Sequence, residues 1–147
     1  MAGGNFSLKF ILVDDKETIN KIAEAAQQDF IKKVHYVVVA CSNPGRTVNA
    51  YEKRGKIYVR QQAGAAIQNF LLKVTEEKLA TCWVGHFVES QIKNALNIPS
   101  DINVEAIFPI GFEAEKKRTR KEPIDLDNIL YFHEWEKRRM KKLNMTY

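Results

Sequence analysis

The chain has 147 residues, of which 45% are hydrophobic and 28% charged, so it has the size of one globular domain and is too apolar to be a disordered protein. No apolar run approaches the roughly 20 residues of a membrane-spanning helix. Residues 1–5 lack the basic and apolar regions of a secretory signal. We therefore expect a single domain over residues 1–147, located in the cytoplasm and without a membrane partner.

The net charge of +5 is unevenly spread, because residues 113–147 carry 10 basic against 7 acidic side chains. We interpret this part, from about residue 113, as a basic C-terminal tail with dense runs at 116–121 and 137–142. A nucleic-acid module would need basic residues interleaved with stacking aromatics, or a known recognition pattern. Neither is found in the sequence, so nucleic-acid binding through the tail stays a minor alternative.

Hydrophobic periodicity predicts alternating helices and strands along the chain. The expected strands are residues 10–13, 36–41, 81–84 and 104–110, and the expected helices are residues 16–30, 62–78 and 88–96. Asp14 and Glu17 resemble a capping box at the start of the first helix. Because the elements mix without a regular βαβ rhythm, the sequence favours an α+β fold over a doubly wound sheet.

Residues 46–56 are polar and carry Arg46 and Arg54 beside glycines, so we expect a long loop there with at most one helical turn. Long loops in compact domains are often functional, which makes this segment a candidate lid.

The titratable residues offer few catalytic candidates. Cys41 and Cys82 lie in apolar stretches without metal or redox spacing, so we expect both to be reduced and buried. No phosphate-loop, nucleophile-elbow or metal-ligand motif occurs in the sequence, and we assign no catalytic side chain and no metal. His86 follows Gly85 at the expected end of a strand, where its side chain either projects over a site or lies at an ordinary exposed turn.

Four segments, taken together, carry a resemblance to a known family. They are QQAGAAIQNFLL at residues 61–72, LATCWVGHF at 79–87, FPIGF at 108–112 followed by AEK at 114–116, and the basic triplet RTR at 118–120. In this order and spacing the chain resembles the nitroreductase family of flavin-dependent oxidoreductases, over roughly residues 10–135.

The resemblance implies an antiparallel-centred sheet flanked by helices and an intertwined homodimer that holds FMN at its interface. It implies that Trp83, Val84, Gly85 and His86 face the flavin ring through their backbone, with the Gly85 amide near the N5 atom that carries the hydride. It also implies that Arg118 and Arg120 bind the flavin phosphate, and that Asn5 contacts the flavin. The implied activity is hydride transfer from NAD(P)H through FMN to an electron-poor small molecule of the nitroaromatic or quinone type.

The chain departs from the family pattern in three places. It has no match to the Arg-Arg-Ser-x-Arg segment near the usual start, it keeps only Gly-Asn of a Gly-Asn-x-Gln-Pro-Trp motif, and Gln62 stands where Asp is common. These departures keep an alternative open, in which a truncated family member acts as a flavin-binding, nucleotide-binding or structural dimeric module without turnover. Arg46, Arg54 and Arg60 are candidate replacements for the arginines of that segment.

Overall fold

The computed structural model describes residues 2–113 and 124–138, and the chain divides into two units, Met1–Ala114 and Glu115–Tyr147. With η for a 3₁₀ helix, the first unit contains η1 (Ala2–Gly4), β1 (Leu8–Val13), α1 (Lys16–Ala26), η2 (Asp29–Lys33), β2 (Tyr36–Ser42), α2 (Gly45–Glu76), β3 (Ala80–Thr81), α3 (Glu89–Leu96) and β4 (Asn103–Gly111). Among the described residues, no helix has the length and apolarity needed to cross a bilayer.

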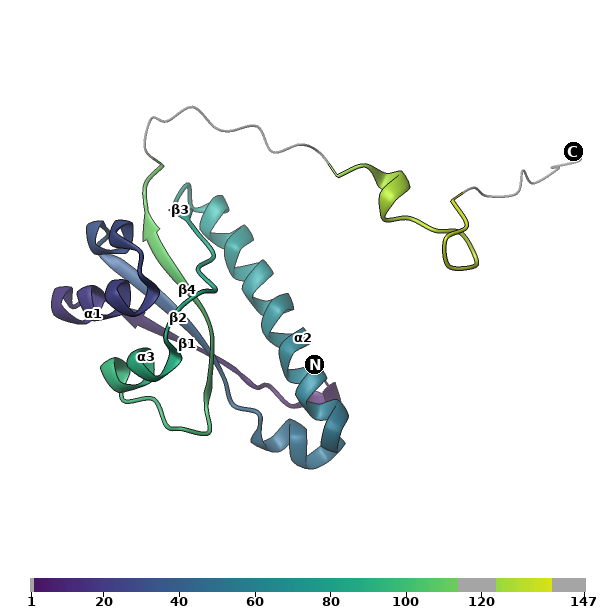
Figure 1. The fold of residues 1–147 in the computed structure, drawn as a ribbon, viewed down its shortest axis with the longest axis horizontal. Helices are drawn as coiled ribbons and strands as arrows, with labels where there is room; N and C mark the ends of the chain where they lie inside the picture. The colour runs from purple at the N-terminus through teal and green to yellow at the C-terminus, as the bar shows by residue number, and fades with distance from the viewer. Residues whose placement is uncertain (1, 114–123, 139–147) are drawn as a thin grey trace, which may run out of the picture. The chain divides into compact units, whose positions relative to one another are not determined.

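One four-stranded antiparallel sheet, in the order β1-β2-β4-β3, organises the first unit (Figure 1). The central strand β2 is almost continuously buried because successive side chains point to opposite faces and both faces are covered. Val37, Val39 and Cys41 belong to one core cluster, whereas Val38 and Ala40 belong to the other. The predicted α+β class, with helices on both faces of an antiparallel sheet, is confirmed.

Helices α1 and α3 cover one face of the sheet (Figure 1), where Ile22 and Ile92 are fully buried. Helix α1 begins at Lys16 as predicted, but its cap is Asp15 and not Asp14, because the side chain of Asp15 accepts a hydrogen bond of 2.8 Å from the Thr18 N–H. It also ends earlier than the predicted residue 30. Gln27 takes a left-handed conformation with φ 53° and closes the helix, and η2 follows.

Helix α2 covers the opposite face, where Ala63 and Ile67 pack on Phe108 and Ala106 of β4. The sequence prediction was wrong here, since residues 46–56 form the first part of α2 and not a loop. The helix is broken once, at Glu52, whose φ of 49° and ψ of −126° are non-helical. This break lets a short first segment fold back against the main helix.

Gly55 is what allows this close approach. A Cβ atom at Gly55 would lie 2.5 Å from the Thr47 carbonyl oxygen and 2.6 Å from the Val48 Cα, which is closer than real Cβ atoms come. The glycine that suggested a loop in the sequence therefore serves tight helix packing.

Strand β3 is also shifted from its expected position. β3 covers only Ala80–Thr81 instead of residues 81–84, and Val84 joins the sheet through an isolated bridge to Ile107. β4 matches its prediction within a residue, and so does α3.

The second unit is described over residues 124–138 only. It contains η3 (Leu126–Asn128) and an edge-to-face ring contact between Tyr131 and Trp135, with centroids 5.0 Å apart. The Phe132 N–H donates to the Lys137 carbonyl at 2.7 Å and closes a local turn.

Candidate functional site

The segment after β3 is anchored at both ends. Val84 and Ile107 exchange two backbone hydrogen bonds of 3.0 Å each, and the Val88 N–H donates to the Ala25 carbonyl at the end of α1 at 2.8 Å. Gly85 and His86 lie between these two anchors and are exposed. Residues 83–86 are called the 83–86 loop below.

The 83–86 loop presents free backbone donors. Within the described residues, the N–H groups of Gly85 and His86 form no backbone hydrogen bond. The Trp83 indole packs edge-on against Phe108, with centroids 5.7 Å apart, yet 46% of the residue is exposed. This part of the chain therefore combines an aromatic surface with hydrogen-bond donors that a planar polar ligand can use.

Glycine at position 85 is not demanded by the protein's own packing. A Cβ atom there would lie 3.8 Å from the Trp83 Nε1, an ordinary contact, and Gly85 has no left-handed φ. The space that the missing side chain leaves open is on the solvent side. A ligand that approaches the backbone closely is a physical reason for glycine at such a position.

The structure does not bring all the predicted site residues together. Trp83, Val84, Gly85 and His86 are adjacent, with Val84 buried and the other three exposed. Asn5 lies before β1, at the opposite edge of the sheet from β3, where it lines a small pocket with Arg46. Arg118 and Arg120 lie outside the described residues.

The prediction that both cysteines are buried was wrong for Cys82, which lies directly before the 83–86 loop. It is exposed, whereas Cys41 is buried as predicted, and both are free thiols. Burial and the nearby Glu105 carboxylate raise the pKa of the Cys41 thiol to about 11. Cys41 is therefore a core residue, and Cys82 is the accessible thiol of the pair.

A polar cluster between α2 and β4 has no counterpart in the sequence predictions. The Glu105 side chain is only 6% exposed, and it accepts hydrogen bonds from Arg60 at 2.9 Å and from the Ser42 hydroxyl at 2.5 Å. Asn103 in turn donates to the Ser42 hydroxyl at 3.2 Å. Arg60 and Glu105 are 45 residues apart, so no local pattern signals the pair.

Buried polar atoms without partners occur in two of the family-like segments. Both amide atoms of Gln62 in α2 and the Thr81 hydroxyl in β3 are buried, and they form no hydrogen bond with any residue that the structure describes. An unpaired buried polar group is unfavourable unless a ligand, water or partner supplies the missing bond.

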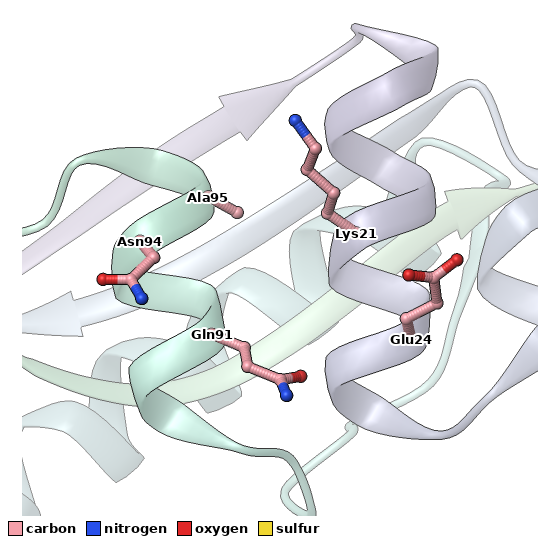
Figure 2. Close-up of a pocket in the computed structure, with 5 residues that line it drawn as sticks. All are labelled: Lys21, Glu24, Gln91, Asn94 and Ala95. Atoms are coloured by element: carbon pink, nitrogen blue, oxygen red, sulfur yellow. The ribbon is translucent and has the colours of Figure 1, made fainter.

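A separate shallow groove lies between α1 and α3, on the other face of the sheet from α2 (Figure 2). Its volume is about 540 Å³, and its lining side chains are Lys21, Glu24, Gln91, Asn94 and Ala95. Lys21 is already paired with Glu17 at 2.7 Å. None of the predicted site residues lines this groove.

A four-stranded antiparallel sheet of this order, with α1 and α3 on one face and α2 on the other, defines the fold as α+β. The nitroreductase family model matches residues 8–112. The chain belongs to the nitroreductase family.

Known proteins similar to this chain agree with that assignment. A relative from Methanocaldococcus jannaschii, named as a nitroreductase, is 35% identical over 85 residues, which are 57% of this chain and 43% of that protein. The structure of a nitroreductase family protein from Clostridium novyi is 27% identical, with a TM-score of 0.67, and the match covers 90% of this chain and 73% of that protein. The structure of an FMN-dependent nitroreductase from Clostridium difficile is 21% identical, with a TM-score of 0.72, and the match covers 88% of this chain and 76% of that protein. The chain thus spans less than half of the first of these relatives.

Proposed function

We propose that the protein is an FMN-dependent oxidoreductase that passes a hydride from NAD(P)H to an electron-poor acceptor of the nitroaromatic or quinone type. The observation that carries this proposal is the 83–86 loop, which offers two free backbone N–H donors beside an exposed tryptophan in a chain of the nitroreductase family. The names of similar proteins support it, since one is an FMN-dependent nitroreductase.

The residues of the loop fit a flat heteroaromatic cofactor. Gly85 leaves room for close approach, its N–H is free to donate to a ring nitrogen, and Trp83 supplies apolar surface next to it. When bound, FMN supplies the hydride-accepting and hydride-donating chemistry. The chain's part is to position the ring, to donate a hydrogen bond to it and to exclude water, and no side chain of this chain is assigned as acid or base.

The phosphate end of the cofactor needs cations. We assign this role to Arg118 and Arg120, because arginine forms paired charge-assisted hydrogen bonds with phosphate. Arg120→Ala should then weaken FMN affinity by roughly ten- to a hundredfold, since one such bond contributes about 1.5–3 kcal/mol. Lys141→Ala is the charge-matched control, and equal FMN affinity in all three proteins would remove Arg120 from the site.

We also propose a homodimer. The outward face of α2 carries Ile57 and Leu72, which are 50% and 60% exposed, with Gly64 and Ala65 between them. Small residues between exposed apolar ones suit close packing against a second copy. We keep Asn5, which precedes β1, as a further contact to the flavin, as the family resemblance implies. Light scattering at micromolar concentration should give twice the chain mass, and a monomer contradicts this assembly.

The colour of the purified protein tests the redox proposal. A yellow preparation that bleaches on addition of NAD(P)H and recovers with a quinone or nitroaromatic supports turnover. Protein that stays colourless after incubation with FMN and removal of the excess supports the alternative, a dimeric module without turnover.

A further inference from the structure

A further pocket lies at one end of the sheet and has a volume of about 760 Å³. Four segments meet there: the residue after β1, the residues that lead into β2, the residue before β3, and the end of β4. Its volume lies within the roughly 300–1,000 Å³ of pockets that bind small molecules. No residue of the 83–86 loop lines it, and neither does any other residue that we assign to FMN. The pocket is therefore separate from the candidate flavin site.

One part of the pocket wall is apolar. Val34, Leu79 and Ile110 line it and are half-buried. The rings of Tyr36 and Phe112 line the same pocket, and 48% and 85% of these two residues are exposed. Exposed aromatic rings favour contact with another ring, in a stacked or an edge-on arrangement. The apolar part therefore suits an aromatic group of a ligand.

The other part of the wall carries two opposite charges that are not paired with each other. Asp14 and Lys33 both line the pocket and are exposed. Neither side chain forms an ion pair or a hydrogen bond within residues 2–113 and 124–138. The preceding residue Lys32, in contrast, is paired with Asp29 at 3.0 Å. The carboxylate of Asp14 and the ammonium of Lys33 thus both remain available to a ligand.

The fold holds these two charges in neighbouring places. Val13 of β1 pairs with Val37 of β2, and the Lys16 ammonium donates to the Lys32 carbonyl. The aspartate lies between these two contacts on one segment, and the lysine lies between them on the other. The two side chains therefore face the same space without contacting each other, and a compact group that carries both charges can bridge them.

We propose that this pocket binds a free α-amino acid with an aromatic side chain. Near neutral pH such a molecule carries an ammonium and a carboxylate on the same carbon atom, so it can form charge-assisted hydrogen bonds with Asp14 and Lys33 at once. His35 and Tyr36 also line the pocket, and their side chains can donate further hydrogen bonds to the carboxylate. The aromatic side chain then lies on the apolar part of the wall.

A titration of the full chain with L-phenylalanine, followed by ¹H–¹⁵N NMR, tests both the binding and its place. The amide signals should shift saturably, with the largest shifts at residues 33–36 and 110–112, which line the pocket. The absence of saturable shifts, or largest shifts in another part of the chain, overturns the proposal. Signals of these residues that move when the protein is diluted without ligand assign the pocket to a contact between copies and also overturn it.

Two substitutions remove one charge of the pocket each. Asp14→Asn and Lys33→Gln should each weaken the binding of phenylalanine about tenfold, the effect of losing one charge-assisted hydrogen bond. Asp101→Asn and Lys53→Gln are the controls, because they remove exposed charges that do not line the pocket, and both should bind like wild type. Equal losses in the pocket variants and in their controls refute the site.

Two analogues that keep one charge each distinguish recognition of both charges from simple charge attraction. Phenethylamine lacks the carboxylate and 3-phenylpropionate lacks the ammonium, so each should bind about tenfold more weakly than phenylalanine. Lys33→Gln should not weaken the binding of phenethylamine, and Asp14→Asn should not weaken that of 3-phenylpropionate. An analogue that binds as tightly as phenylalanine, or that both substitutions weaken, contradicts a site for an amino acid.

The variant Phe112→Ala tests the apolar part of the wall. Because 85% of Phe112 is exposed, its removal should hardly change the stability of the fold. The affinity for phenylalanine should nevertheless fall about threefold or more, since apolar contact area with the ligand is lost, and L-alanine should bind wild type at least about tenfold more weakly than phenylalanine. Equal binding of the two amino acids disproves the aromatic preference. None of these measurements requires FMN, so their outcome is independent of the redox proposal.

Discussion

Gly55→Ala should destabilise the protein although alanine is the better helix former. Alanine gains about 1 kcal/mol over glycine inside a helix. Its Cβ, however, would lie 2.5 Å from the Thr47 carbonyl oxygen, and ordinary contact begins near 3.4 Å, so the two segments of α2 must separate by about 0.9 Å. Overpacking of this kind costs typically 1–3 kcal/mol. Because both nearest atoms belong to the backbone, we expect about 3 kcal/mol, and a net loss of about 2 kcal/mol.

Urea unfolding followed by circular dichroism measures this loss, and Gly64→Ala is the matched control. Gly64 lies on the same helix, and a Cβ atom there meets nothing within 4 Å. Within one chain only the helix propensity acts at Gly64, so under conditions in which the proposed dimer is dissociated Gly64→Ala should gain up to about 1 kcal/mol. The two substitutions should therefore change the free energy of unfolding in opposite directions. If Gly55→Ala is as stable as wild type or more so, the close packing of the two α2 segments is refuted.

Three further predictions follow from the described contacts. A thiol reagent at pH 8 should label one cysteine rapidly, Cys82, and should reach Cys41 only after unfolding, because burial raises the pKa of Cys41 to about 11; two fast thiols contradict this. The pKa of the Glu89 carboxyl is lowered, first by a hydrogen bond from the Val104 N–H of β4 and then by Lys93 of α3. The ionised Glu89 therefore stabilises the fold above pH 4.5, its ordinary pKa, and this stabilisation is lost as the pH falls through the lowered pKa of the folded state. The stability difference between wild type and Glu89→Gln should shrink accordingly in acid, and a difference independent of pH counts against the contact. Arg60→Ala should lower the free energy of unfolding by about 1–3 kcal/mol, since it leaves the buried Glu105 carboxylate without its cation. In a double-mutant cycle, the same substitution should cost less when Glu105 is already replaced by Gln. Equal losses in the two backgrounds disprove the coupling.

Local periodicity was sufficient for most of the secondary structure. Five elements were predicted within a few residues of their observed bounds: the strands β1, β2 and β4 and the helices α1 and α3. Each is a short segment whose apolar residues follow the spacing typical of a strand or of a helix. The first part of α2 was missed because its polar, glycine-flanked residues read as a loop. This first segment is stabilised as a helix by packing, since the chain folds back at Glu52 and brings Thr47 against Gly55. Helix propensity alone does not reveal such a contact.

The candidate site was predictable where it is continuous in the chain. The 83–86 loop follows from one motif, and the structure exposes three of its four residues. The Arg60–Glu105 pair and the pocket around Arg46 and Thr47 join segments that are distant in sequence, so they depend on strand order and register. Cys82 was expected to be buried because its neighbours are apolar, but it follows the end of the two-residue strand β3, where alternation no longer determines burial.

The double hydrogen bond between Val84 and Ile107 has a consequence for the kinetics of binding. With the Val88 bond to α1, it holds Gly85 and His86 as a short span between two fixed points. A ligand that meets a span of this kind finds its donors already oriented, so little conformational entropy is lost on association. Association rates at this surface should therefore be governed by diffusion and charge rather than by a slow rearrangement of the loop.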